Sequence, residues 1–114
     1  ESGRLLIPVA IHSQDGAEFQ SRGRAACLLS DDGGQSWRWS DTILEADPDS
    51  KTGLQEPGLV PFADGKIWMY IRTDRGSQLG SWSEDGGVTW SPAEPTSLIS
   101  PVAPATIEAV PGSE

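Results

Sequence analysis

The hydrophobic positions of this chain fall into short apolar runs, which are separated by clusters of glycine, proline and acidic residues. Short apolar runs bounded by turn-forming residues are typical of β-strands. Strands are therefore predicted in segments 3–10, 24–29, 56–62, 65–72, 78–82 and 103–109. Thirteen glycines, nine prolines and five tryptophans agree with tight turns that join short aromatic strands, so the predicted fold class is all-β.

An eight-residue motif occurs twice. Residues 30–37 read Ser-Asp-Asp-Gly-Gly-Gln-Ser-Trp and residues 83–90 read Ser-Glu-Asp-Gly-Gly-Val-Thr-Trp. Each copy, here called an Asp box, follows a short apolar strand and precedes another, so repeat one spans about 3–62 and repeat two about 65–110. A unit of this size with four short strands matches one blade of a β-propeller, and blades stack because one small sheet cannot bury both faces alone. We therefore predict that residues 1–114 form a single two-blade propeller segment.

The repeat also predicts which residues share a rim. We number the four strands of a blade from the propeller axis outward. In this numbering the chain is expected to begin with strand 2 of one blade, to run through strands 2, 3, 4, 1, 2, 3 and 4, and to end with strand 1 of a further blade. The ends of the chain therefore do not coincide with the ends of blades. Antiparallel pairing makes Glu56, at the start of one strand, a neighbour of Arg72, at the end of the next, and puts the Asp boxes on the opposite rim. Repeat one is longer than repeat two at two places, and we expect both insertions, roughly 13–22 and 41–52, to be loops on the Glu56/Arg72 rim.

The Asp boxes are expected to stabilise the fold rather than to bind a substrate. In such a turn the aspartate accepts backbone N–H bonds, the glycines adopt positive φ and the tryptophan packs between strands. The residues given this structural role are Ser30, Asp32, Gly34, Trp37, Ser83, Asp85, Gly87 and Trp90.

The paired boxes, the Glu-Pro-Gly strand that begins at Glu56 and the Ile-Arg-Thr-Asp strand end around Arg72 together resemble the bacterial sialidase (neuraminidase) family, whose β-propeller has six blades. In that family a glutamate lies sixteen residues before an arginine and a further Asp box follows; Glu56, Arg72 and Asp85 match this pattern. The resemblance implies exo-type hydrolysis of terminal sialic acid by the complete propeller. It implies that Arg72 is one of three arginines that bind the substrate carboxylate, and that Glu56 is the base that activates a tyrosine nucleophile.

Other residues near this rim leave alternatives open. Asp74 and Arg75 follow the same strand end and are further candidates for substrate binding. An exposed Glu–Arg pair is also a common surface ion pair, worth at most about 1 kcal/mol. Tyr70 is expected to have a packing role rather than a nucleophilic one, and His12, which takes the place of Asp74 in the first repeat, is expected to be a solvated rim residue.

Several parts of the family's site have no counterpart in this sequence. The Phe/Tyr-Arg-Ile-Pro motif, a third arginine strand and a suitable nucleophilic tyrosine are absent, and Ala10 and Ala103 stand where the other repeat has Arg72 and Glu56. We therefore expect a partial glycoside hydrolase that is inactive as an isolated monomer. Two other interpretations stay open. One is a self-assembling unit, in which complementary strand edges let three copies close six blades. The other is a non-catalytic carbohydrate-binding propeller.

Charge and the length of the apolar runs limit the partners that are expected. The formal net charge of -9 is spread along the chain without a Lys/Arg cluster, which argues against nucleic acid. No apolar run reaches the roughly 20 residues that span a bilayer and no signal peptide opens the chain, so no membrane association is expected. The chain starts at Glu1 without an initiator methionine, which suggests processing or a longer parent.

The remaining chemistry of the sequence is limited. Cys27 lies in an apolar run and is expected to be a buried, inert thiol. No metal or other cofactor is expected, because no residues have metal-ligand spacing. The expected partner is a sialic-acid-like carbohydrate.

Overall fold

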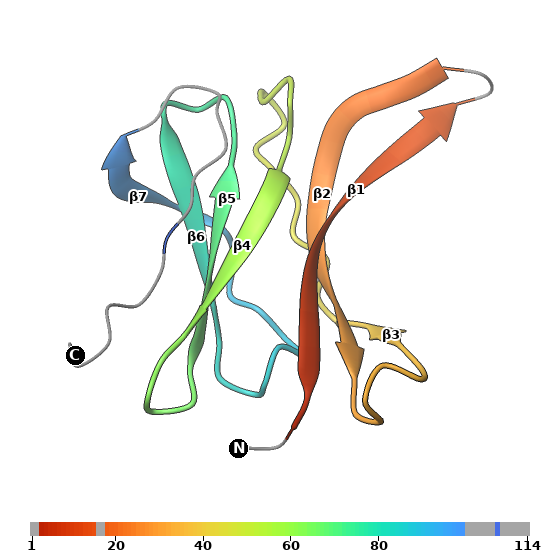
Figure 1. The fold of residues 1–114 in the computed structure, drawn as a ribbon. Helices are drawn as coiled ribbons and strands as arrows, with labels where there is room; N and C mark the ends of the chain where they lie inside the picture. The colour runs from red at the N-terminus through yellow and green to blue at the C-terminus, as the bar shows by residue number, and fades with distance from the viewer. Residues whose placement is uncertain (1–2, 16–17, 100–106, 108–114) are drawn as a thin grey trace.

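The structure is a computed structural model that describes residues 3–15, 18–99 and 107, and it contains two antiparallel β-sheets that lie side by side (Figure 1). The first sheet has the order β1-β2-β3, with strands Leu5–Asp15, Glu18–Ser30 and Arg38–Trp39. The second has the order β4-β5-β6-β7, with strands Gln55–Pro61, Ile67–Arg72, Ser77–Ser83 and Glu94–Ile99. The predicted all-β fold class is confirmed. No helix in the described part of the chain is long and apolar enough to cross a membrane.

The strand order agrees with the predicted phase of the repeats. Segment 56–62 pairs with the strand that follows it and so begins the second sheet as β4. Within the described residues, the first sheet has three strands and lacks a counterpart of β4. The last predicted strand, 103–109, lies outside the described residues except for Ile107, whose N–H donates to the Tyr70 hydroxyl at 3.3 Å.

The core lies between the two sheets. Alternation along each strand turns one side chain in two toward the other sheet, and Met69 and Ile71 of β5 are fully buried there. The other buried members of this cluster are Ala25, Cys27, Leu29, Leu44, Leu54, Leu79 and Trp90. Burial raises the pKa of the Cys27 thiol to about 12, so the thiol stays protonated near neutral pH.

The expectation of a rim loop at 13–22 is wrong. Strands β1 and β2 remain paired as far as Asp15 and Glu18, beyond an irregularity between His12 and Gln14. The added residues satisfy their backbone hydrogen bonds against each other, so they lengthen the hairpin instead of forming a loop. Figure 1 shows this hairpin bending away from the second sheet.

The insertion at 41–52 forms part of the connection between the sheets. Leu44 exchanges two backbone hydrogen bonds with Ala25 of β2, at 2.7 and 3.0 Å, and is itself buried in the core. Beyond it the chain reaches the end of the sheets at which β5 terminates (Figure 1). This insertion therefore lies at the expected rim, but β2 holds its first part in place.

Both Asp boxes form the same hydrogen-bonded turn. One carboxylate oxygen of Asp32 accepts the N–H of Ser36 at 2.9 Å, and one of Asp85 accepts the N–H of Thr89 at 2.9 Å. Both glycines of each box have positive φ, 75° and 94°. Hydrogen bonds from the hydroxyls of Ser36 and Thr89, followed by those from the backbone, lower the pKa values of Asp32 and Asp85 to about 2. Both carboxylates are therefore charged at neutral pH and stabilise their turns by accepting these hydrogen bonds.

The two boxes differ in what covers them. Trp90 is 7% exposed and belongs to the core, and Gly87 lies so close to the first sheet that a Cβ there would stand 2.9 Å from the Leu6 side chain. Trp37 is 39% exposed, against the expectation that it packs between strands. The reason is that the second box packs against the first sheet through Gly87 and Trp90, whereas no second sheet of the described residues packs on Trp37.

Asp85→Ala is expected to destabilise the chain more than Asp32→Ala. The first substitution removes hydrogen bonds from the turn that holds Trp90 in the core, and we expect it to lower the free energy of unfolding by about 2 kcal/mol. The second acts on a turn whose tryptophan is exposed. Urea denaturation of both variants beside the wild type measures the difference. Equal losses for the two variants would contradict the distinction between the boxes.

Candidate functional site

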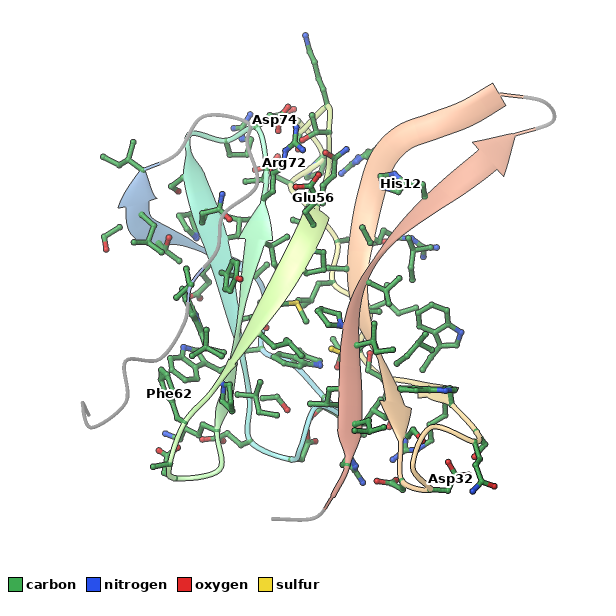
Figure 2. All side chains as sticks on the ribbon, in the orientation of Figure 1. His12, Asp32, Glu56, Phe62, Arg72 and Asp74 are labelled. Atoms are coloured by element: carbon green, nitrogen blue, oxygen red, sulfur yellow. The ribbon has the colours of Figure 1, made fainter. Side chains whose placement is uncertain are left out.

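Glu56 and Arg72 meet at one end of the second sheet. Arg72, the last residue of β5, pairs with Gln55 at the start of β4, and its Nη1 donates to Glu56 Oε1 at 2.9 Å. Figure 2 shows this pair at the opposite end of the sheets from Asp32. The predicted separation of the pair from the first Asp box is therefore confirmed.

A β-bulge sets the position of Glu56. The β4–β5 ladder passes from the pair Gln55–Arg72 to the pair Gly58–Tyr70, so β4 contains one extra residue. Glu56 has φ 47°, the one positive φ recorded for a non-glycine residue in the described part of the chain. Such a left-handed conformation costs a non-glycine residue about 1–2 kcal/mol, and bulges commonly redirect a side chain next to functional sites. No pattern in the sequence indicates this bulge.

The exposure of the pair suits contact with a ligand better than a role in stability. The Glu56 side chain is 49% exposed and that of Arg72 23%. An ion pair so close to solvent contributes at most about 1 kcal/mol to folding. Yet the backbone of Arg72 is held by its pairing with Gln55 of β4, and the preceding Ile71 pairs with Leu79 of β6. A planar guanidinium offers a carboxylate two parallel donors. The arrangement is thus able to bind an anion with a carboxylate close by.

Asp74 lies beyond the end of β5 and contacts the connection between the sheets. Its carboxylate accepts the Ser50 hydroxyl at 2.5 Å and the Lys51 N–H at 2.9 Å. The hydrogen bond from Ser50, followed by backbone hydrogen bonds that outweigh desolvation, lowers the pKa of Asp74 to about 2. Arg75, the other candidate here, is exposed in the turn after β5. Ser50 was not among the candidates, since a serine in a connecting segment has no distinguishing pattern.

Tyr70 and His12 are both held by neighbouring backbone. Tyr70 is mostly buried, and its ring packs so tightly on Gly58 that a Cβ there would lie 2.2 Å from it. This agrees with the expected packing role. His12 lies at the Glu56 end of the molecule (Figure 2) but is half-buried against Gly23, where a Cβ would stand 3.0 Å from its ring, so the expectation of a solvated histidine is corrected.

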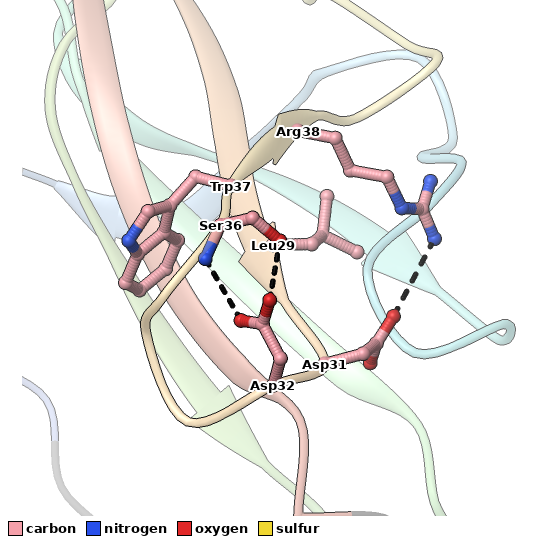
Figure 3. Close-up of a pocket in the computed structure, with 6 residues that line it drawn as sticks. All are labelled: Leu29, Asp31, Asp32, Ser36, Trp37 and Arg38. Carbon is pink, nitrogen blue, oxygen red and sulfur yellow. Dashed lines mark hydrogen bonds and ion pairs between the residues drawn. The ribbon is translucent and has the colours of Figure 1, made fainter.

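The end of the molecule that carries the first Asp box has a shallow depression of about 220 Å³ (Figure 3). It is lined by Leu29, Asp31, Asp32, Ser36, Trp37 and Arg38. Asp32 is held within its own turn, and Asp31 pairs with Arg38 at 4.0 Å. The depression is therefore a feature of the turn and is remote from Glu56. In the described residues, no three or more His, Cys, Asp or Glu side chains are grouped so that they could hold a metal ion.

Solved structures share this fold over most of the chain. The NanB sialidase from Streptococcus pneumoniae is 27% identical with a TM-score of 0.58, and the match covers 84% of this chain and 12% of that one. The intramolecular trans-sialidase from Ruminococcus gnavus, in complex with oseltamivir carboxylate, is 29% identical with a TM-score of 0.53, covering 83% and 17%. A Dyadobacter fermentans protein of unknown function, at 24% identity and TM-score 0.64, covers 82% and 24% and shows the fold alone. The chain thus spans at most 24% of these neighbours.

These neighbours confirm the resemblance to bacterial sialidases and the sialidase-like β-propeller fold, of which this chain is a segment. No curated protein matches the chain. The family described as the BNR repeat-like domain matches residues 1–112. The chain therefore belongs to the BNR repeat-like domain family.

Proposed function

We propose that this chain is part of a sialidase-type glycoside hydrolase, to which it contributes Glu56 as the base and Arg72 as one ligand of the substrate carboxylate. The observation that supports this most is the Glu56–Arg72 contact of 2.9 Å at a bulge on the rim away from the first Asp box. Likeness to two sialidases of 27% and 29% identity supports the reaction class.

Arg72 would bind the carboxylate that distinguishes sialic acid from neutral sugars. Its guanidinium is partly exposed and projects from a paired strand end, so little conformational entropy would be lost when it accepts a ligand. Arg75 lies in the next turn and would add a second positive charge at the same rim. The hydrogen bonds that Asp74 makes with segment 50–52 keep its own carboxylate occupied.

Glu56 would take the proton of a tyrosine nucleophile that lies elsewhere in the complete propeller. Tyr70 is poorly suited to that task, because it is mostly buried against Gly58 and its hydroxyl accepts the Ile107 N–H. A neutral phenol attacks an anionic sugar without the repulsion that a carboxylate nucleophile would meet. The missing arginines would also come from other blades, since the chain spans 12% and 17% of the two sialidases.

Arg72→Ala should weaken binding of free sialic acid by about 10- to 100-fold, because it removes a charge-assisted, two-pronged contact. Arg72→Lys should be intermediate, since it keeps the charge but loses the planar fork. NMR titration of the ¹⁵N-labelled chain with sialic acid at millimolar concentration measures this. Arg38→Ala, an exposed arginine at the other end of the molecule, is the matched control. Equal binding by wild type and Arg72→Ala would refute the assignment.

The purified monomer should not hydrolyse a fluorogenic sialoside, because its site lacks a nucleophile. Glu56→Gln should leave sialic acid binding within about twofold, since glutamine keeps the shape of the side chain and removes only its charge. Turnover by the wild-type monomer above the Glu56→Gln background would contradict a partial site. Within the complete propeller, a Glu56→Gln variant that hydrolyses as fast as the wild type would refute the role of Glu56 as the base.

A second candidate function is self-assembly, in which further copies complete the propeller. The observation that favours it is exposed apolar surface on both sheets: each of the following side chains is between 41% and 48% exposed, namely Leu5, Ile7, Trp39, Phe62 and Trp82. Phe62 and Trp82 form an edge-to-face pair with centroids 5.1 Å apart. Patches of exposed apolar surface are typical of interfaces.

If three copies close one ring, light scattering of the purified chain should give three times the 12.1 kDa monomer mass. Trp82→Glu should then convert the trimer to monomer, because it places a charge on an apolar interface. Glu84→Gln, at an exposed position just after β6, is the control. A wild-type chain that stays monomeric at all accessible concentrations would eliminate this candidate.

A further inference from the structure

One carboxylate organises the chain just before Glu56. Asp74 accepts the Ser50 hydroxyl at 2.5 Å with one oxygen, and the N–H groups of Lys51 and Thr52 at 2.9 and 3.4 Å with the other. The Ser50 oxygen in turn accepts the N–H of Gly53 at 2.9 Å. A single side chain at the end of β5 therefore fixes four consecutive residues, 50–53, which we call the clamp segment.

The first sheet holds the clamp segment from its other side. The N–H of Gly23 in β2 donates to Thr52 O at 2.9 Å, and Leu54 N–H donates to Gly23 O at 2.8 Å. Gly53 has φ 66°, and a Cβ there would lie 2.3 Å from Gly23 O, so the two backbones are in direct contact. Leu54 is fully buried in the core. The clamp segment is consequently fixed relative to both sheets.

The clamp segment leads directly into the bulge that carries Glu56. A residue with φ 47° persists in that conformation only when its surroundings determine it from both sides. On the C-terminal side the β4–β5 ladder resumes at Gly58. On the N-terminal side the bulge is preceded by a single ladder pair, Gln55 with Arg72, and then by the clamp segment.

We propose that Asp74 is a positioning residue: by anchoring the clamp segment to the end of β5, it holds Glu56 in its left-handed conformation and its carboxylate against Arg72. The inference rests on the proposed function, because it takes Glu56 and Arg72 as the site. Arg72 and Asp74 are two residues apart, so the carboxylate ligand and the clamp belong to one strand end. In this role Asp74 acts through the backbone of residues 50–56 and makes no contact with the sugar.

The alternative is that Asp74 binds the substrate directly, and its hydrogen bonds speak against this. Three donors already occupy the carboxylate, and their combined effect keeps it charged, so it would repel an anionic sugar. Ser50 separates the two roles, because its side chain is buried, with the residue 3% exposed, and so it has no access to a ligand. Removal of the Ser50 hydroxyl therefore changes sugar binding only if the clamp segment positions Glu56.

The test compares Asp74→Asn and Ser50→Ala with Asp49→Asn, a control that removes the same charge from an exposed position beside the clamp segment. In the wild-type chain, the positive φ of Glu56 gives a strong intraresidue amide-to-Hα NOE, because these protons are closest in the left-handed region. Both clamp variants should weaken this NOE and speed amide exchange at Lys51 and Gly53 about tenfold. The control should change neither.

Sialic acid titration of the same samples provides the functional readout. We expect both clamp variants to weaken binding about 3- to 10-fold while their urea midpoints show a folded chain, and the control to bind as wild type. Ser50→Ala is informative even if Asp74→Asn fails to fold.

An unchanged Glu56 NOE in a folded clamp variant would overturn the inference. So would a loss of binding in Asp74→Asn that Ser50→Ala does not reproduce, because that pattern indicates direct contact. Failure of the wild-type chain to bind sialic acid would refute the proposed function, and the Glu56 NOE would then decide the clamp by itself.

Discussion

The fold depends on the burial of one face of each sheet against the other. Met69 and Ile71 of the second sheet pack with Leu29 of the first, and Trp90 closes the same core from its turn. Because a sheet of three or four strands cannot bury both of its faces alone, neither sheet has an independent core. The contact between the sheets also positions the rim, because the strands that end there contribute side chains to the core: β5, for example, ends at Arg72 and carries Met69 and Ile71.

The carboxylates in and beside the second sheet differ in the partners that they contact. Asp85 accepts hydrogen bonds within its own turn, and Asp74 accepts them from the clamp segment. Glu56 instead makes an ion pair with Arg72 and is half exposed. These three acidic side chains of the second sheet and its turns therefore differ in how many local hydrogen-bond donors each one finds.

The repeat in the sequence was sufficient to predict the all-β class, the strand order and the rim at which Glu56 meets Arg72, because antiparallel pairing leaves few alternatives once two similar units are aligned. It was not sufficient for three features. The lengthened hairpin at 13–22 depends on continued backbone pairing, the exposure of Trp37 on what covers the sheet, and the contact of Asp74 with Ser50 on the path of the connection. Each is a tertiary outcome, and no local pattern encodes it.

The positive φ of Glu56 affects how substitutions at this position should be read. A β-branched residue is strongly disfavoured in the left-handed region, whereas glycine and asparagine adopt it readily. Loss of activity in a Glu56→Val variant would thus report on the backbone as much as on the missing carboxylate. Glycine or asparagine at this position is compatible with the bulge but supplies no carboxylate, so either residue would separate the backbone requirement of the site from its charge.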